Sequence, residues 1–281
     1  MGEIIPLFPL GSPLFPGVVL PLQIFEPRYR RLVRDLMALP EGSDRRFFGV
    51  VGIRQGWEVE KIAPAEALYD IGCTARVQLV RPGTDGTFQV VTVGGDRFRL
   101  LDVLVGSEPP YLQAEVEWLT EEEAAEEAAG DHDGLADDAD ELAADVARGS
   151  MAVLVRAVRG LFARYVIEVA GLQDGPEGRG ASAEEYGLAS ADQDPDLHPG
   201  LAGEIAELLK GVADDATALS YLVASVSMLT NEDRQALLAE SATRRRLAAE
   251  ARMLRRELTL VRALGAVPVP LTQFATPMTV N

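Results

Sequence analysis

Hydrophobic positions in the first 119 residues recur in short runs that are typical of strands. Phe47–Ile53 is an apolar run bounded by turn residues, and Tyr69–Val80 alternates apolar and polar positions. Further short runs follow the same pattern at Trp57–Ile62, Thr87–Val93, Phe98–Val105 and Leu112–Trp118. Because almost no helical spacing separates them, these strands predict an antiparallel barrel or sandwich.

The stretch Ile4–Arg31 combines six prolines with many large apolar side chains. Proline lacks a backbone N–H and has a fixed φ, so we expect neither a helix interior nor a central strand here. Short strands separated by turns satisfy both features, with a turn at Phe15-Pro16-Gly17 and the best strand at Val18–Ile24. A helix is expected from Pro27, because apolar positions then recur at helical spacing at Tyr29, Leu32, Val33 and Leu36.

The second half of the chain has helical periodicity. The stripe Leu154, Val158, Leu161, Phe162, Tyr165 and Val169 predicts a helix of about 30 residues from Leu142 to near Gly171. Further helices are expected at Ile205–Val212, Asp215–Leu229, Thr230–Ala239 and Ser241–Leu264. The last of these carries the stripe Leu247, Ala251, Leu254, Leu258 and Val261 and is stopped by Gly265. These elements predict a helical bundle.

The formal net charge of −18 is concentrated in two segments. Glu121–Asp145 contributes −12 and Asp174–Asp196 contributes −6, so the remaining residues are neutral overall. Such tracts are typical of solvated connecting segments. The single cysteine, Cys73, cannot form an internal disulfide, and neither a signal peptide nor a membrane-spanning run is recognisable. These features favour a cytoplasmic protein.

Two groups of motifs carry a family resemblance. The first is LFPL at residues 7–10, FPG at 15–17 and LPLQIFEPRY at 20–29; the second is VGGDRFR at 93–99, followed by AEVEWL. Together they resemble the amino-terminal, substrate-binding domain of Lon proteases, in particular stand-alone proteins that contain only this domain. The resemblance implies an α+β fold: a small antiparallel PUA-like β-barrel with one helix, followed by a C-terminal α-helical bundle.

The expected domains follow from the pattern and the resemblance together. Residues 1–119 form the barrel, 120–140 an acidic linker, and 141–265 the helical bundle, with an acidic loop at about 173–199 inside it. A Pro-rich tail occupies 266–281.

The residues present do not support catalysis. Lon proteases combine a P-loop ATPase with a Ser–Lys peptidase, but the only lysines here, Lys61 and Lys210, lie in neither motif. His132 and His198 fall in the acidic segments, and with one cysteine they cannot supply the ligands of a zinc site. We therefore expect a non-enzymatic protein without a catalytic residue, metal or cofactor.

The candidate binding residues lie inside the two family motifs: Phe25, Glu26, Arg28, Tyr29, Arg97 and Phe98. In the functional interpretation they edge a groove, between barrel and bundle, that holds an extended or unfolded peptide by strand-edge pairing and aromatic contacts. In the structural alternative, Glu26, Arg28 and Arg97 form ion pairs or caps that fix the helix start against the barrel.

The expected function is therefore a substrate-recognition module that acts as an adaptor or holdase. Its expected partners are unfolded polypeptides and an ATP-dependent protease or chaperone. One alternative is an RNA-binding PUA-like protein, suggested by seven arginines in the last helix; interleaved glutamates favour a solvated helix face instead. A small-molecule-sensing regulatory domain is a second alternative. The stripe of the last helix makes a dimer conceivable.

Overall fold

The computed structural model describes residues 2–54, 65–106, 108–119, 137–173, 209–212 and 215–265, with the side chains of 137–148 and 171–173 excluded. Several expectations therefore lie outside the described residues: the strand at Trp57–Ile62, most of the acidic linker, the acidic loop, both histidines and the tail.

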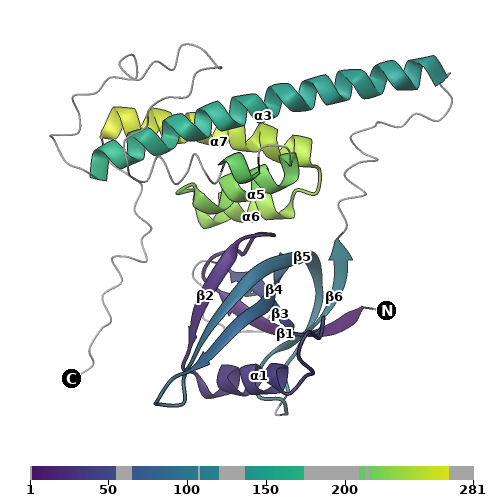
Figure 1. Ribbon diagram of the computed structural model, residues 1–281, viewed down its shortest axis with the longest axis vertical. Helices are drawn as coiled ribbons and strands as arrows, with labels where there is room; N and C mark the ends of the chain where they lie inside the picture. Colours follow the sequence, from purple (N-terminus) through teal and green to yellow (C-terminus); the bar gives the residue numbers. More distant parts are fainter. Residues whose placement is uncertain are drawn as a thin grey trace. The chain divides into compact units, whose positions relative to one another are not determined.

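The chain has a mixed α+β fold (Figure 1). The elements, in chain order, are β1 (Glu3–Leu10), β2 (Val19–Ile24), α1 (Pro27–Met37), β3 (Phe47–Ile53), β4 (Leu68–Pro82), β5 (Phe88–Leu104), β6 (Gln113–Leu119), α3 (Asp137–Gln173), α5 (Ala216–Val226), α6 (Asn231–Ala239) and α7 (Thr243–Leu264).

The six strands form one sheet in the order β2-β5-β4-β3-β1-β6, and β6 also pairs with β5. Every pair is antiparallel except β1–β3, which is parallel. The expected antiparallel sheet therefore contains one parallel pair. A parallel pair needs a long crossover, and β2 and α1 both lie in the connection between β1 and β3.

Strand β1 also corrects the expectation that proline excludes a central strand, because β1 lies between β3 and β6 and contains Pro6 and Pro9. Glu3–Pro6 pairs with β6, whereas Leu7–Leu10 pairs with β3. Each proline therefore lies where only one of the two neighbouring strands is in register. The missing N–H groups cost less there than in a strand paired on both sides.

The expected strands Thr87–Val93 and Phe98–Val105 form one continuous strand, β5. A register shift lies between them: Ala75 is opposite Gly94, but Cys73 is opposite Arg97, so β5 carries an extra residue. This is the bulge that paired glycines permit. Gly94 is required for a second reason, because a Cβ there would overlap the carbonyl oxygen of Phe15.

The turn and helix expected in Ile4–Arg31 are confirmed. Gly17 has a φ of 75°, and the N–H of Val18 donates to the carbonyl oxygen of Phe15 at 3.2 Å. Pro27 occupies the first turn of α1, whose buried face is Tyr29, Leu32, Val33 and Leu36.

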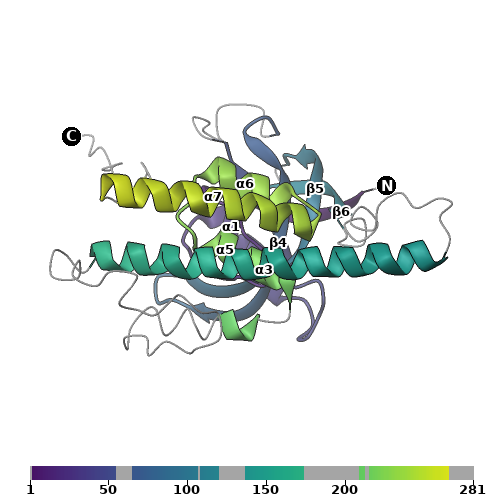
Figure 2. The same cartoon turned by 90° about the horizontal axis from the view of Figure 1, so that it is seen from above.

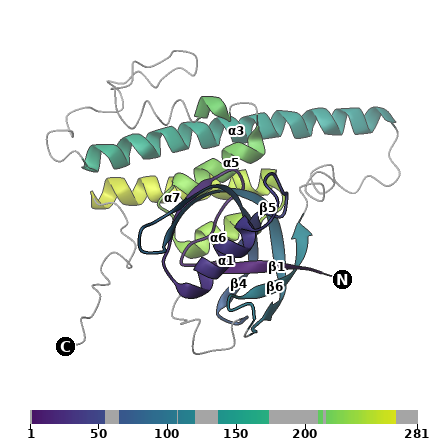
Figure 3. The same cartoon turned by 60° about the horizontal axis from the view of Figure 1, so that its bottom comes forward.

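The chain separates into two compact units. Unit 1 comprises Met1–His132 and Asn231–Thr243, and unit 2 comprises Asp133–Thr230 and Arg244–Asn281. Helix α6 thus belongs with the sheet, although the sequence suggested a place in the bundle. Within unit 1, α1 lies at one end of the curved sheet and α6 at the other (Figures 1 and 3).

Unit 2 is built on α3 and α7, which run side by side (Figure 2). The two helices are parallel, because Leu161 and Leu258 line the same groove and Glu168 pairs with Arg262 further along both helices. Both expected stripes contribute to one core, so the stripe of α7 packs within unit 2. Helix α3 begins at Asp137, inside the expected linker, where acidic residues favour a helix N-terminus.

Part of the polar face expected on α7 is buried. Arg246 is completely buried, donates from Nε to the hydroxyl of Ser220 at 2.7 Å, and lies over the ring of Tyr221. Glu250 and Glu257 are also buried, at 0% and 4% exposure. Helical spacing alone did not distinguish these three buried side chains from the exposed arginines of α7. Arginine in particular can bury its aliphatic stem while its charged head finds specific partners.

Candidate functional site

The junction between β2 and α1 holds four of the six candidate residues. Phe25 is 67% exposed, directly after β2. Glu26 occupies the N-cap position of α1 but makes no side-chain cap; its carboxylate accepts a hydrogen bond from Nε of Arg28 at 2.9 Å instead. The ion pair of the structural alternative is therefore present, and the cap is not. Both side chains are partly exposed, at 41% and 32%.

Tyr29 faces inward from the first turn of α1. Its ring packs on Phe8 with centroids 4.1 Å apart, and the guanidinium of Arg28 lies over it. Burial raises the pKa of its hydroxyl. Because Tyr29 is only 5% exposed, it supports the junction from beneath.

Phe98 and Arg97 are both buried in β5, on opposite faces of the strand because successive side chains alternate. Phe98 belongs to a core cluster and fills the space above Gly49, where a Cβ would lie 2.8 Å from its ring. Arg97 donates from Nη1 to the carbonyl oxygens of Leu238 at 2.9 Å and Glu240 at 3.4 Å. These oxygens lie at the C-terminal end of α6, where carbonyl groups lack helical partners and a cation is favoured.

The six candidates therefore do not form one surface. Ile24 is opposite Phe88, whereas Arg97 is opposite Cys73 and Leu119. The strand between Phe88 and Arg97 spans up to about 30 Å, at roughly 3.3 Å per residue. Of the six, Phe25, Glu26 and Arg28 reach the surface, while Tyr29, Arg97 and Phe98 hold the fold of unit 1.

The structure adds an exposed and largely apolar stripe that ends at Phe25. Val19, Pro21, Gln23 and Phe25 alternate with half-buried or buried neighbours and face solvent together. We call these four residues the β2 stripe; Val19 is 58% exposed and Phe25 67%. Strand β2 pairs with β5 alone, so its second edge has no strand partner among the described residues. Pro21 within an otherwise good strand was the available signal, since proline marks edge strands.

Helix α6 is held to unit 1 by further polar contacts. The Nε2 of Gln235 donates to the carbonyl oxygen of Ile71 at 2.8 Å, and the Nδ2 of Asn231 donates to that of Gly11 at 2.6 Å. Arg234 lies over the ring of Phe15. These contacts join α6 to the first motif region, at Gly11 and Phe15, and to strand β4, at Ile71.

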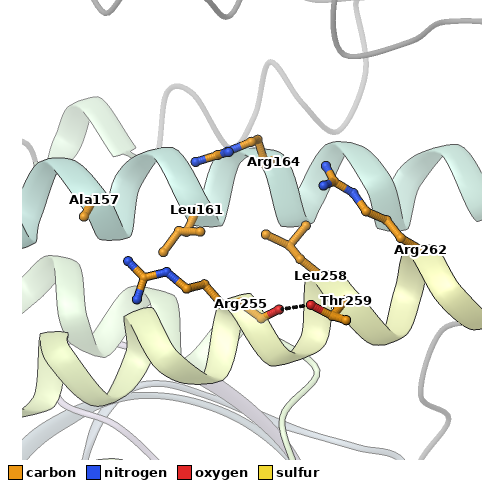
Figure 4. A pocket seen from close by; sticks show the side chains of 7 residues that line it. All are labelled: Ala157, Leu161, Arg164, Arg255, Leu258, Thr259 and Arg262. Atoms are coloured by element: carbon orange, nitrogen blue, oxygen red, sulfur yellow. Dashed lines mark hydrogen bonds between the residues drawn. The ribbon is translucent and has the colours of Figure 1, made fainter.

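Unit 2 contains a groove between α3 and α7 (Figure 4). Its volume is about 460 Å³, and its lining is Ala157, Leu161, Arg164, Arg255, Leu258, Thr259 and Arg262. We call it the α3–α7 groove. The groove was not predicted from the sequence, because helical spacing placed the arginines of the last helix on a solvated face and gave no sign that this face adjoins α3.

The described residues contain no group of three His, Cys, Asp or Glu side chains arranged to hold a metal ion. Within the same residues, no helix combines the length and apolar character needed to cross a membrane. The thiol of Cys73 is buried, and desolvation raises its pKa to about 12, so it is a poor nucleophile.

Comparison with known proteins assigns this α+β architecture to a class. The N-terminal domain of Mycobacterium avium complex Lon protease has the same fold, with a TM-score of 0.50, 15% identity, and coverage of 90% of this chain and 98% of that one. The family model of the ATP-dependent protease La (LON) substrate-binding domain matches residues 4–256. The chain belongs to this family.

Sequence relatives agree with the assignment. Lon protease 2 of Sorangium cellulosum is 35% identical over 122 residues, which are 43% of this chain and 14% of that protein. Lon protease 1 of Herpetosiphon aurantiacus is 23% identical over 258 residues, which are 92% of this chain and 24% of that protein. The chain thus spans a minor part of the length of these relatives.

Proposed function

We propose that the chain is a non-catalytic recognition module that binds extended or unfolded polypeptide segments at the β2 stripe. The observation that carries the proposal is a pair of exposed apolar side chains: Val19, which is 58% exposed on the edge strand β2, and Phe25, which is 67% exposed directly after it. Contiguous exposed apolar surface is typical of sites that bind other molecules. The family description, a substrate-binding domain, supports the same conclusion.

The mode of binding follows from the strand. An extended peptide can add to the free edge of β2 through main-chain hydrogen bonds, while its apolar side chains contact Val19 and Phe25. Pro21 has no N–H to donate, so the added strand cannot form an uninterrupted ladder. Side-chain contacts must then supply more of the affinity. Binding should therefore favour apolar segments and depend little on the order of the residues in them. Glu26 and Arg28 flank Phe25 as a polar rim.

A binding assay tests this site. Reduced, carboxymethylated lactalbumin labelled with fluorescein serves as the unfolded client, and native lactalbumin as its folded counterpart. We expect only the unfolded form to bind. A double variant with Val19→Asp and Phe25→Ala, which we call the stripe variant, should weaken binding by about tenfold, because each substitution removes apolar contact. Leu101→Ala is the matched control, because Leu101 is 51% exposed on β5 of the same unit.

Two results would contradict the site. Equal losses in the stripe variant and in Leu101→Ala would show that exposed apolar area in general is responsible. If Glu26→Ala, Arg28→Ala and the stripe variant each bind the client as the unmodified chain does, the junction between β2 and α1 is not part of the binding site.

A second pair of assays separates an adaptor from a holdase. A holdase suppresses aggregation of a heat-unfolded client by itself, whereas an adaptor accelerates degradation of the client only when an ATP-dependent protease is added. We propose the adaptor role on the basis of the Lon relatives, so the unmodified chain should accelerate degradation only when the protease is present, and the stripe variant should lose this effect.

A further inference from the structure

The α3–α7 groove has an apolar floor and a basic rim. Ala157, Leu161 and Leu258 form the floor, and Arg164, Arg255 and Arg262 approach it from both helices (Figure 4). Its volume of about 460 Å³ lies within the range of ligand-binding pockets. Leu161 and Leu258 are only 7% and 6% exposed, so the groove combines a shallow apolar floor with donors for anions.

Two of the three arginines have no carboxylate partner among the residues that the structure describes. Arg262 is paired with Glu168 through two nitrogens, each 2.7 Å from Oε1. Arg164 donates from Nε to the carbonyl oxygen of Gly160 and pairs with no carboxylate among the described residues. Arg255 likewise has no carboxylate partner within the described part of the chain, and its side chain is exposed.

The surrounding helices strengthen the positive field. Residues 149–170 and 243–264 carry ten arginines and three glutamates; Arg246, Glu250 and Glu257 are buried, which leaves nine arginines and Glu168. This concentration of cations occurs in a chain whose formal net charge is −18. A local basic surface attracts anionic partners by complementary charge, and the attraction weakens with salt.

The apolar floor favours one class of anionic partner, an acidic polypeptide, over another, a nucleic acid. A nucleic acid backbone would gain from the arginines but not from the three aliphatic side chains between them. A carboxylate-bearing polypeptide with aliphatic side chains can use both parts, with paired guanidinium–carboxylate hydrogen bonds at the rim. We propose that the α3–α7 groove binds a short acidic polypeptide segment carrying aliphatic residues. This partner site is separate from the β2 stripe and does not depend on it.

The test uses the full chain and a fluorescein-labelled peptide of alternating Glu and Leu, followed by fluorescence anisotropy. Arg164→Glu and Arg255→Glu should each weaken binding about tenfold, because a repulsive charge replaces an attractive one at short range. Arg252→Glu is the matched control: Arg252 is exposed on α7, lies outside the lining, and changes the net charge by the same amount. It should change binding by less than about twofold.

Further outcomes bear on the same inference. Phe25→Ala should leave binding of this peptide unchanged. That result would show that binding at the α3–α7 groove can be tested independently of the β2 stripe. Equal weakening by all three arginine variants would overturn the groove in favour of a diffuse charge effect.

A uridine oligonucleotide that binds more tightly, with the same dependence on Arg255, would reassign the groove to nucleic acid. If the labelled peptide binds only after the acids in Asp174–Asp196 are replaced by neutral residues, the occupant of the groove is the chain's own acidic segment and not a separate partner. Circular dichroism of each variant verifies that unit 2 is folded.

Discussion

The guanidinium of Arg97 donates to the carbonyl oxygen of Leu238 at 2.9 Å, although 141 residues separate them in the sequence. One residue lies in the second family motif and the other near the end of α6. The contact ties a helix that follows most of unit 2 to the sheet of unit 1. A buried cation that satisfies carbonyls at a helix C-terminus is a structural anchor.

We predict that Arg97→Met lowers the free energy of unfolding of unit 1 by about 2–3 kcal/mol, because buried carbonyls lose a charged donor. Trp118 lies in β6 of unit 1, so its fluorescence during urea unfolding reports on this unit. Arg99→Met is the control, since Arg99 is about half exposed and pairs with Glu117 on the surface. A loss of similar size in both variants would contradict the anchor.

We predict that Glu250→Gln stabilises unit 2 at neutral and alkaline pH. Desolvation raises the pKa of Glu250 well above its usual value, Arg246 opposes this more weakly, and neither carboxylate oxygen has a hydrogen-bond partner within the described part of the chain. A carboxyl with a raised folded-state pKa favours folding when protonated, so this contribution is complete below the unfolded pKa and is lost as pH rises through the folded pKa.

The variant should therefore gain about 1–2 kcal/mol near pH 8, where an unpaired buried charge is costly, and little near pH 5. Thermal unfolding followed by circular dichroism at both pH values measures the difference. A gain that is equal at both, or a loss at pH 8, would contradict the assignment.

We predict that Cys73 does not react with a disulfide reagent in the native protein. With its pKa raised to about 12, the thiolate fraction near pH 8 is on the order of one in ten thousand, and burial blocks access as well. Since Cys73 is the only cysteine, addition of denaturant should release one reactive thiol per chain. Rapid labelling without denaturant would show that β4 opens locally.

We predict that Gly94→Ala destabilises unit 1 by about 1–3 kcal/mol, because the new Cβ overlaps the carbonyl oxygen of Phe15 and the backbone must move. Gly11→Ala is the control, because a Cβ there meets no atom within 4 Å and its φ is not positive. Urea unfolding followed by tryptophan fluorescence compares the two. Equal stability would mean that the Phe15–Val18 turn can shift freely.

Much of the fold could be predicted because periodicity shows which face of an element is buried. The α1 face, the stripes of α3 and α7, and strand β3 were all expected at the residues where the structure has them. The candidate site was predicted less completely. Phe25 is exposed at an edge as a contact residue should be, whereas Phe98 and Arg97 carry similar motif signals and are buried.

The sequence by itself determined the class of the chain: a strand-rich first half, a helical second half, the turn at Gly17 and the family motifs. Only the tertiary structure decided which elements cover one another. It places α6 with the sheet, divides the pairing of β1 between two neighbours at its prolines, and buries Arg246 and Glu250. The physical reason is that spacing along a chain reports a buried face but not its partner, which distant residues such as Arg97 and Leu238 supply on folding.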